Sequence, residues 1–176
     1  MIRLGGVYMK NFKKINVKEL PENPIQLFAD DWALLTSGDE NGYNTMTVSW
    51  GGVGELWNKE VCFIFVRPQR YTFEFTEKND LFTLSFYPKE YHKALSFCGS
   101  HSGRDFDKAK ETGLTPLFVD GSTAFEQAKI VLVCKKIAGQ FMDPDGFYDK
   151  SIEKNYAAGD YHKIYVGEIV SCYVKK

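Results

Sequence analysis

The chain has 176 residues, of which 44% are hydrophobic, and its 22 basic and 23 acidic side chains leave a formal net charge of −1. This length suits one domain with a sizeable core, so we expect a single domain over residues 1–176, with residues 1–8 as an upstream extension if Met9 is the true start. The balanced charge gives no reason to expect nucleic acid or a membrane surface as partner. No apolar run approaches the roughly 20 residues of a membrane span, and a secretory signal is lacking, so we expect a cytoplasmic protein.

Six segments are rich in β-branched and aromatic residues and bounded by turn formers, which predicts strands. They are Trp32–Thr36, Thr45–Trp50, Val61–Val66, Leu81–Phe86, Ile130–Ile137 and Lys163–Val174. The turn cluster at residues 37–42 predicts a hairpin between the first two. Many short strands without βαβ alternation or a GxGxxG motif predict a mainly β fold, a Greek-key barrel, rather than a dinucleotide-binding parallel sheet.

Helices are predicted at Pro88–Phe97 and Arg104–Thr112, and more weakly at Tyr148–Ala157. The segment Tyr71–Thr76 is ambiguous. Its alternation of apolar and polar residues favours a strand, whereas its position just after Arg67-Pro68 favours a short helix.

Four cysteines, Cys62, Cys98, Cys134 and Cys172, form no CxxC pair, and three of them lie in apolar, strand-like runs. We expect them to be free and buried as small hydrophobes. Cys98 and His101 have no second pair of ligands at zinc spacing, so no metal site is predicted.

The first segment with chemical potential is residues 44–52, N-T-M-T-V-S-W-G-G. In a strand, alternation would place Thr45, Thr47 and Ser49 on one face and Met46, Val48 and Trp50 on the other. A row of hydroxyls beside exposed strand backbone can hydrogen-bond the rim of a flavin ring. The alternative is an ordinary solvent-facing strand.

The second segment, V-R-P-Q-R-Y-T, carries two arginines around a turn. A helix beginning at Tyr71 or Thr72 would present free N–H groups to an anion, and Arg67 or Arg70 could add forked hydrogen bonds to a phosphate. The alternative is a solvated turn in which Arg67 pairs with a surface carboxylate. A third segment, G-S-H-S-G-R-D-F-D-K at residues 99–108, is a small-residue loop before a predicted helix, and so another candidate anion site.

In combination these segments are more specific. The runs N-T-M-T-V-S-W-G, V-R-P-Q-R-Y-T, F-T-L-S-F, S-G-R-D-F-D-K, G-L-T-P and G-D-Y-H-K-I-Y-V-G-E-I occur in this order over almost the whole chain. Together they resemble flavin reductase-like proteins of the flavoredoxin type. The resemblance implies a split β-barrel homodimer that binds FMN near the subunit interface.

The resemblance also implies roles for individual residues. The flavin ring would lie along Asn44, Thr45, Met46 and Thr47, with Ser49 and Trp50 close by. The phosphate would be held by Arg70, Tyr71 and Thr72, helped by Ser102, Gly103 and Lys108. His162 would stand near the reactive face of the flavin, although Tyr161 separates it from Asp160, where the family commonly has Asp and His adjacent.

Because the flavin itself would carry the redox chemistry, the absence of a catalytic triad in the sequence is expected. The function predicted is an NAD(P)H-dependent flavin reductase that transfers hydride to FMN. The main alternative is a non-catalytic FMN electron carrier reduced by a redox protein partner. Two others are an enzyme like pyridoxamine phosphate oxidase and a barrel that has lost its cofactor.

Overall fold

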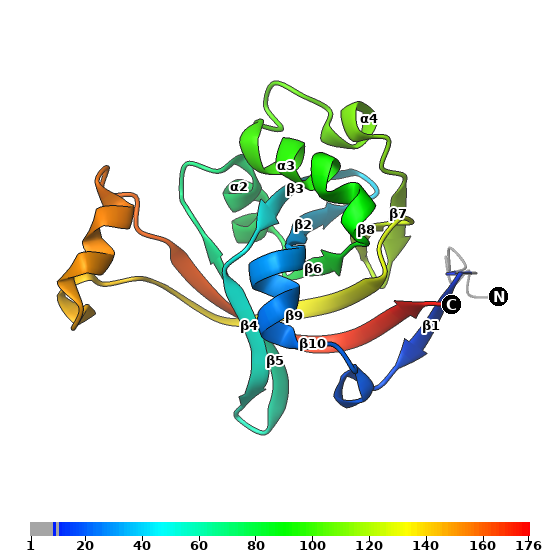
Figure 1. The fold of residues 1–176 in the computed structure, drawn as a ribbon, viewed down its shortest axis with the longest axis horizontal. Coiled ribbons are helices and arrows are strands. Elements are labelled where there is room, and N and C mark those ends of the chain that lie inside the picture. Colours follow the sequence, from blue (N-terminus) through cyan, green and yellow to red (C-terminus); the bar gives the residue numbers. More distant parts are fainter. Residues whose placement is uncertain (1–8, 10) are drawn as a thin grey trace.

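A computed structural model describes Met9 and residues 11–176, and the extension proposed for residues 1–8 lies outside the described residues. The chain is mainly β, as predicted. Eight antiparallel strands form one sheet in the order β3-β2-β6-β9-β10-β5-β4, with β1 paired to β10, and β7 pairs with β8 in a separate hairpin (Figure 1). The strands are β1 (Phe12–Ile15), β2 (Ala33–Asp39), β3 (Gly42–Val48), β4 (Gly51–Leu56), β5 (Lys59–Val66), β6 (Leu81–Phe86), β7 (Pro116–Val119), β8 (Ser122–Phe125), β9 (Ile130–Phe141) and β10 (Lys163–Lys175).

The main sheet is a split barrel. Its outermost strands, β3 and β4, follow each other in the sequence and are separated only by Ser49 and Trp50. The sheet must therefore curl until its two edges approach each other at this connection, yet the edges are not hydrogen-bonded to each other. The predicted strand Thr45–Trp50 is corrected here: β3 ends at Val48, and Trp50 lies in the opening between the edges.

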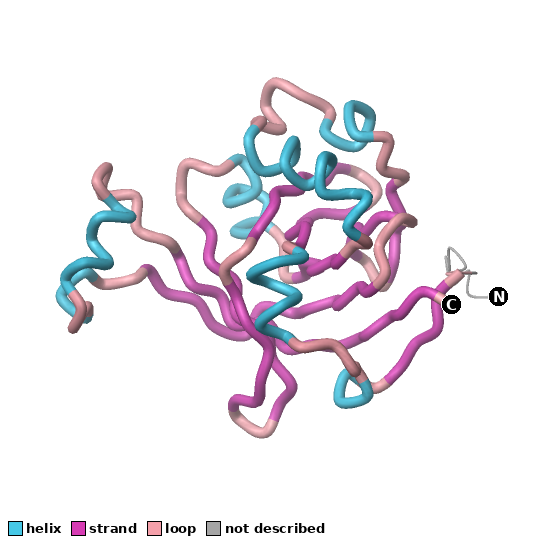
Figure 2. The backbone as a smooth tube through the Cα atoms, in the orientation of Figure 1, coloured by secondary structure: helices cyan, strands magenta, loops and turns pink. Residues whose placement is uncertain are grey.

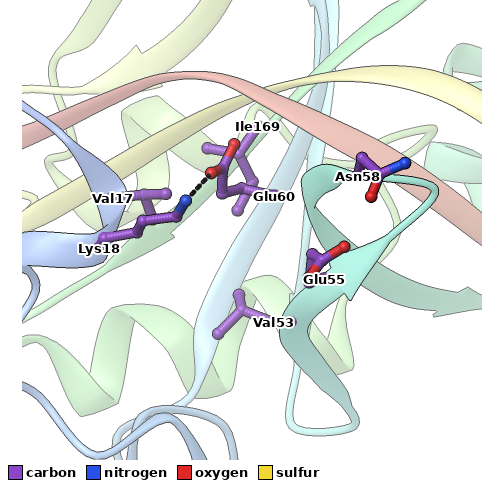
Figure 3. Close-up of a pocket in the computed structure, with 8 residues that line it drawn as sticks. Val17, Lys18, Val53, Glu55, Asn58, Glu60 and Ile169 are labelled. Carbon is purple, nitrogen blue, oxygen red and sulfur yellow. Dashed lines mark ion pairs between the residues drawn. The ribbon is translucent and has the colours of Figure 1, made fainter.

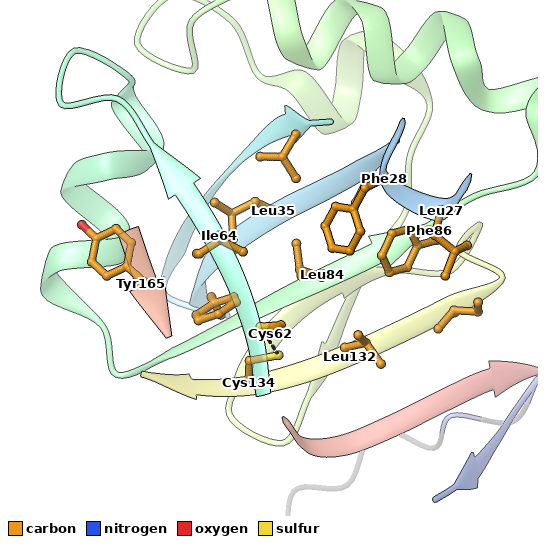
Figure 4. Close-up of a cluster of buried hydrophobic side chains, with 14 of the residues drawn as sticks. Leu27, Phe28, Leu35, Cys62, Ile64, Leu84, Phe86, Leu132, Cys134 and Tyr165 are labelled. Carbon is orange, nitrogen blue, oxygen red and sulfur yellow. Dashed lines mark hydrogen bonds between the residues drawn. The ribbon is translucent and has the colours of Figure 1, made fainter. Parts of the chain in front are cut away.

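The barrel interior is filled by side chains from almost every strand of the main sheet (Figure 4). Leu35, Ile64, Leu84 and Leu132 are all at most 1% exposed. Each such side chain contributes about 1.5–3 kcal/mol through burial of its apolar surface. A second cluster packs between the outer face of the sheet and the helices, with Leu34, Tyr87 and Leu95 fully buried.

All four cysteines are free and buried, which confirms the prediction made for them. The Sγ atoms of Cys62 on β5 and Cys134 on β9 lie 3.3 Å apart in the interior (Figure 4). The intervening strand β10 carries Gly167 at this point, where a Cβ would lie 3.1 Å from that of Cys134 and 2.5 Å from the ring of Phe82. The glycine therefore makes room for the close packing.

Helices α2 (Tyr71–Lys78) and α3 (His92–Ser100) pack on strands β2 and β3, and α4 (Lys108–Thr112) packs on α3 (Figure 2). Helix α1 (Pro24–Gln26) lies against β4 and continues into a π-helical turn η2 (Leu27–Asp31). The short 3-10 helices are η1 (Val17–Glu19), η3 (Lys89–Tyr91), η4 (Pro144–Gly146) and η5 (Lys150–Tyr156), and the last two lie between β9 and β10. None of the helices in the described part of the chain is long and apolar enough to cross a membrane.

The structure decides the ambiguous segment in favour of a helix. Residues 71–78 form α2, and its buried residues are Thr72 and Thr76, which lie one turn apart and face the barrel. The alternation seen in the sequence arises because Phe73 packs toward the barrel core while Phe75 meets Tyr71 edge-on, with ring centroids 5.1 Å apart. The position of this segment just after Arg67-Pro68 therefore predicted its structure better than its alternation of apolar and polar residues did.

Two predicted helices are shorter than expected. The segment Arg104–Thr112 is helical only from Lys108, because the Asp107 side chain accepts a hydrogen bond from the N–H of Lys110 and caps the helix there. The segment Pro88–Phe97 begins as the 3-10 turn η3 before α3. Within Tyr148–Ala157 the helix is 3-10 in type and covers residues 150–156.

A long excursion between β9 and β10, residues 143–161, projects from the body of the molecule and is called the arm below (orange in Figure 1). The backbone N–H of Met142 donates to the carbonyl of His162 over 2.9 Å, which closes the base of the arm. The arm leaves and rejoins the sheet beside the opening between β3 and β4, so its base can contribute to any site there.

Candidate functional site

A groove with two connected hollows lies along the open edge of β3. A strand edge without a neighbour leaves backbone N–H and C=O groups that can bond to a ligand. The first hollow has a volume of about 410 Å³ and is called the aromatic hollow. It is lined by Met46, Thr47, Val48, Ser49, Trp50, Phe65, Arg67, Gln69, Arg70, Asp160 and His162.

The second hollow, of about 220 Å³, is called the cationic hollow. It is lined by Met46, Gln69, Arg70, Tyr71, Thr72, Ser100, His101, Ser102, Gly103, Arg104 and Lys108. Met46, Gln69 and Arg70 line both hollows, so the two form one continuous groove.

His162 forms one wall of the aromatic hollow and is only 8% exposed. Its ring lies 5.3 Å from that of Trp50 and 6.4 Å from that of Phe65, measured between centroids. Its Nδ1 is 2.9 Å from the hydroxyl of Tyr156 on the arm. Burial, with added repulsion from Arg67, lowers the pKa of His162 to about 4. The ring is therefore neutral at physiological pH. A change of charge near neutral pH, one of the properties for which histidine is used at reactive sites, is not available to it.

Arg67 does not face the groove as a free cation. It forms an ion pair with Asp160, and its other terminal nitrogen donates to the carbonyl of Asn155 over 2.8 Å. Gln69 also donates to Asp160. The structure thus shows the alternative considered for Arg67, in which it pairs with a carboxylate. The ion pair connects the arm to the end of β5.

The cationic hollow is built around the start of α2. Arg70 is the N-cap residue, and no side chain caps the first turn of this helix. The free N–H groups and the positive end of the helix dipole therefore face the hollow, an arrangement that favours an anion. Asn44 supports this turn from β3, since its Nδ2 donates to the hydroxyl of Thr72 over 2.7 Å.

Two cations, the half-buried Arg70 and the buried Lys108, flank that helix start. Arg70 donates to the carbonyl of Gly99 over 2.7 Å, and Lys108 Nζ donates over 2.8 Å to each of the carbonyls of Thr45 and Cys98. Burial is the main cause that lowers the pKa of Lys108 to about 8, and repulsion from Arg70 adds to it. Burial also lowers the pKa of Arg70, helped by the charge of Arg67. In the described chain no carboxylate bonds to Arg70 or Lys108, so an anion in the hollow would relieve their repulsion.

The loop between α3 and α4 closes the hollow against β3. Gly103 packs so closely on Asn44 that a Cβ at this position would lie 1.9 Å from Asn44 Oδ1. Only glycine allows this approach, and it brings Ser102 and the backbone of the loop next to the start of α2.

The structure brings most of the predicted site residues together, with one correction. The hydroxyls expected to face a ligand in a row are used within the protein: Thr45 Oγ1 bonds to Thr36 and to the carbonyl of Leu35, and Thr47 Oγ1 donates to the carbonyl of Leu95. Thr45 is buried and does not line the groove, whereas Ser49 is exposed at its rim. Buried strand hydroxyls bond to nearby carbonyls, because an unpaired buried hydroxyl is costly.

Sequence reasoning missed Phe65, Gln69, Arg104 and Tyr156. Arg104 pairs with Glu74 and lies 4.7 Å above the ring of Tyr71, at the outer rim of the cationic hollow. Phe65 is on β5, two residues before Arg67, so alternation from the second segment could have indicated that it shares a face with Arg67. Nothing in the sequence predicts the contact between Tyr156 and His162, since the segment of the arm that joins them has no hydrophobic periodicity.

A wider hollow of about 570 Å³ lies elsewhere, between η1, the β4–β5 hairpin and β10 (Figure 3). Its walls are Val17, Val53 and Ile169, and a Lys18–Glu60 ion pair of 2.8 Å crosses it. Its cation is already paired and no helix of eight or more residues begins there, so its size alone does not make it an anion or cofactor site.

Comparison with solved structures gives the same fold at low sequence identity. An FMN-binding domain of a flavin reductases-like enzyme from Shewanella baltica has a TM-score of 0.67 at 16% identity, over 94% of this chain and 78% of the other. The flavoredoxin of Desulfovibrio vulgaris has a TM-score of 0.65 at 18% identity, over 93% and 78%. An FMN-binding protein from Thermus thermophilus with bound p-hydroxybenzaldehyde has a TM-score of 0.67 at 20% identity, over 92% and 81%.

The comparison with curated proteins gives no match. A family model does match: the flavin reductase like domain covers residues 25–176, which include every strand except β1 and every residue that lines the groove. The chain therefore belongs to the flavin reductase-like domain family.

Proposed function

We propose that this chain binds FMN in the groove and acts as an NAD(P)H-dependent flavin reductase. The observation that carries the proposal is an uncapped helix start between two cations, Arg70 and Lys108, with an aromatic hollow directly beside it. FMN has these two parts, a phosphate and a flat heterocycle. The solved structures with this fold that are described as FMN-binding support the same cofactor.

The residues of the cationic hollow fit a phosphate. Arg70 and the N–H groups of Tyr71 and Thr72 would bind its oxygens, with Ser102 and the backbone at Gly103 on the opposite side. Lys108 uses two of its three N–H bonds on backbone carbonyls, so one remains for the anion. Charge-assisted bonds of this kind are roughly twice as strong as neutral ones.

The residues of the aromatic hollow fit the ring. The backbone of β3 from Met46 to Val48 offers groups at an open strand edge to the polar rim of the ring, and Trp50, Phe65 and His162 supply flat apolar walls. Asn44 and Thr45 would act indirectly. Asn44 would orient Thr72 by donating to its hydroxyl, and the carbonyl of Thr45 would position Lys108 by accepting a hydrogen bond from its Nζ.

Bound FMN would supply the redox chemistry, accepting hydride from a nicotinamide. The protein would contribute orientation and a neutral hydrogen-bond donor. Because its pKa is about 4, His162 stays uncharged at physiological pH, so it can donate a hydrogen bond to a ring carbonyl without adding a positive charge. Trp50, 49% exposed beside it, would offer a second flat ring an aromatic surface that is accessible from solvent.

A non-catalytic electron carrier reduced by a protein partner is the second candidate. The half-exposed Trp50 at the mouth of the aromatic hollow would give a partner protein close access to the ring, and one structural neighbour is a flavoredoxin. The carrier and the reductase share the cofactor and differ in the electron donor.

The test begins with the visible spectrum of the purified protein, followed by release and chromatography of the chromophore. Flavin absorbance with FMN as the released compound is expected, and a colourless protein that does not quench added FMN fluorescence would exclude the proposal. NADH and NADPH are then added anaerobically. Bleaching within the mixing time to minutes supports a reductase, whereas an FMN protein that neither nucleotide bleaches is a carrier.

We also propose that two copies associate. Several large apolar side chains are exposed, among them Trp57 (59%) at the tip of the β4–β5 hairpin and Val170 (44%) on β10, which are the sequence neighbours of Asn58 and Ile169 in the lining of the 570 Å³ hollow. Exposed apolar surface of this kind favours association. Sedimentation at micromolar concentration should show twice the mass of the 20.1 kDa chain, and a single species at the chain mass would contradict it.

A further inference from the structure

The arm carries a buried residue, Tyr156, that has no role in the reaction proposed above. Tyr156 is 5% exposed although it belongs to η5, a short 3-10 helix whose other residues are exposed. Its ring is packed between those of Phe147 and Tyr161, with centroid distances of 6.0 and 4.8 Å. The Arg67 guanidinium lies 5.1 Å from the centre of the same ring. Tyr156 is thus a buried, closely packed side chain on an arm that is otherwise largely exposed.

The contacts of Arg67 explain why this side chain is held at the groove. Arg67 bonds to Asp160 near the end of the arm and to the carbonyl of Asn155, the residue before Tyr156. The backbone pair between Met142 and His162 closes the base. The position of Tyr156 relative to His162 is therefore fixed by three attachments and does not depend on the exposed tip around Tyr148.

The Tyr156 hydroxyl has two neighbours, Nδ1 of His162 at 2.9 Å and Sδ of Met142 at 3.2 Å. A phenol has one hydrogen to donate, so Tyr156 donates either to Sδ of Met142, with Nδ1–H donating to the hydroxyl, or to Nδ1 itself. An imidazole nitrogen is a much better acceptor than a thioether sulfur, and its contact is the shorter of the two, which favours donation to Nδ1 and a neutral ring with its own hydrogen on Nε2. In the described chain Nε2 of His162 has no hydrogen-bond partner, and the ring lines the aromatic hollow.

We propose that Tyr156 is a positioning residue that holds His162 in the tautomer with its hydrogen on Nε2, so that the ring offers a hydrogen-bond donor to the groove. The consequence for flavin reduction rests on the function proposed above, but the tautomer itself does not. Tyr161, the residue before His162, takes part in this arrangement, since its ring stacks on that of Tyr156.

The direct test is the tautomer of His162 in the full-length protein as purified, measured by long-range ¹H–¹⁵N NMR correlations at pH 7. The three histidines are distinguished with His162→Gln as the assignment variant. The wild type should show the Nε2–H form. Tyr156→Phe, which keeps the stacked ring and the Arg67 contact, should raise the Nδ1–H population at least several-fold. A wild-type ring with its hydrogen on Nδ1, or a tautomer unchanged by Tyr156→Phe, would overturn the proposal.

The kinetic test asks whether Tyr156 acts through His162. Tyr156→Phe should slow anaerobic flavin reduction about tenfold while FMN affinity and the nucleotide concentration for half-maximal rate change less than about twofold. In the His162→Ala background the same change should have no further effect, because the group it positions is gone. Equal slowing in both backgrounds would show that Tyr156 acts by another route.

The matched control is Tyr148→Phe, which removes the same hydroxyl from a side chain of the arm that is fully exposed. It should alter neither the tautomer nor the rate. The two tests also separate two failures: a protein without FMN would refute the proposed function and leave the tautomer measurement valid, whereas a reducible flavoprotein with an unchanged tautomer would refute only the role of Tyr156.

Discussion

The two hollows of the groove are built in opposite ways. The cationic hollow has a local centre, since Arg70, Tyr71 and Thr72 are consecutive and the helix start they form presents its own N–H groups, with Lys108 and the loop before α4 closing it. The aromatic hollow depends on distant segments, with Trp50 from the strand connection and His162 held by Tyr156 on the arm. One end offers charge and the other a neutral, flat surface. This difference predicts that substitutions at the two ends will be separable by ligand and by reaction step.

The largest separation is expected at His162. His162→Ala removes the neutral donor and one wall of the aromatic hollow but leaves the cationic hollow intact, so FMN should remain bound. Reduction by NAD(P)H should slow by about ten- to a thousandfold, a range that spans loss of orientation alone to loss of a hydrogen bond that strengthens in the transition state. Anaerobic stopped-flow absorbance measures this step apart from reoxidation.

The control for that substitution is His92→Ala, which removes a histidine stacked on Trp32 outside the groove and should leave the rate unchanged. If His162→Ala lowers the melting temperature without changing the reduction rate, His162 has only a structural role and the two ends do not differ in the way proposed.

At the other end, Arg70→Ala should affect binding and discriminate between ligands. Loss of one charge-assisted bond costs roughly 1.5–3 kcal/mol, so FMN affinity should fall about ten- to a hundredfold. Riboflavin, which has the same ring and no phosphate, should bind almost as before. Fluorescence titration with both ligands measures this, with the exposed Lys110→Ala as a charge-matched control. Parallel losses for FMN and riboflavin would mean that Arg70 supports the fold through its bond to the Gly99 carbonyl.

The same contrast explains what could be predicted from the sequence. All six predicted strands exist, because each is a local run of β-branched and aromatic residues, although the exact ends differ. The strand β4, G-G-V-G-E-L, was missed because its three glycines do not favour a strand, and it is formed by pairing with β5. The short strands β1, β7 and β8 and the helical turn at Pro24–Asp31 also escaped, as they are too short for periodicity to show.

For the candidate site, local order was enough at the cationic end. The run from Arg70 to Thr72 and the loop with Ser102 and Gly103 line it as the sequence suggested. Local order was not enough to predict which partners these side chains bond to. No sequence pattern shows that Thr47 donates to the carbonyl of Leu95 on α3, or that Asp160 forms an ion pair with Arg67. Such pairs depend on how separate elements pack, so the roles of Thr45, Thr47 and Arg67 could be corrected only from the structure.

A smaller effect is expected from pH, and it again belongs to the cationic end. Lys108 has a pKa of about 8, lowered chiefly by burial, and a bound phosphate would raise it. Above pH 8 the flavin-free protein has lost part of this proton, so FMN binding must take it up and affinity falls as pH rises. From pH 8 to pH 9 the loss should be about fivefold, while below pH 7 Lys108 is protonated in both states and contributes no dependence.

Titrations at constant ionic strength between pH 7 and 9.5 test this, with riboflavin as the ligand that shares every property of the ring. Riboflavin affinity should stay flat where FMN affinity falls. Lys108→Arg keeps a cation over the whole range and should flatten the FMN profile as well. A slope that survives in Lys108→Arg would assign the proton to another group.

The smallest effect is expected at Trp50, and it completes the contrast. Half of this side chain is already exposed, and its contact with His162 is a tilted ring pair with centroids 5.3 Å apart. Such aromatic pairs contribute roughly 0.5–1 kcal/mol beyond simple burial, so Trp50→Leu should weaken FMN and riboflavin equally, by about two- to fivefold. Equal loss for the two ligands is the opposite of the result expected for Arg70→Ala. Tyr148→Leu, which alters a fully exposed ring on the arm outside both hollows, is the control and should leave both affinities unchanged. If Trp50→Leu weakened FMN much more than riboflavin, the ring-binding and phosphate-binding ends of the groove would not be independent, and the assignment of the two hollows to the two parts of the cofactor would be wrong.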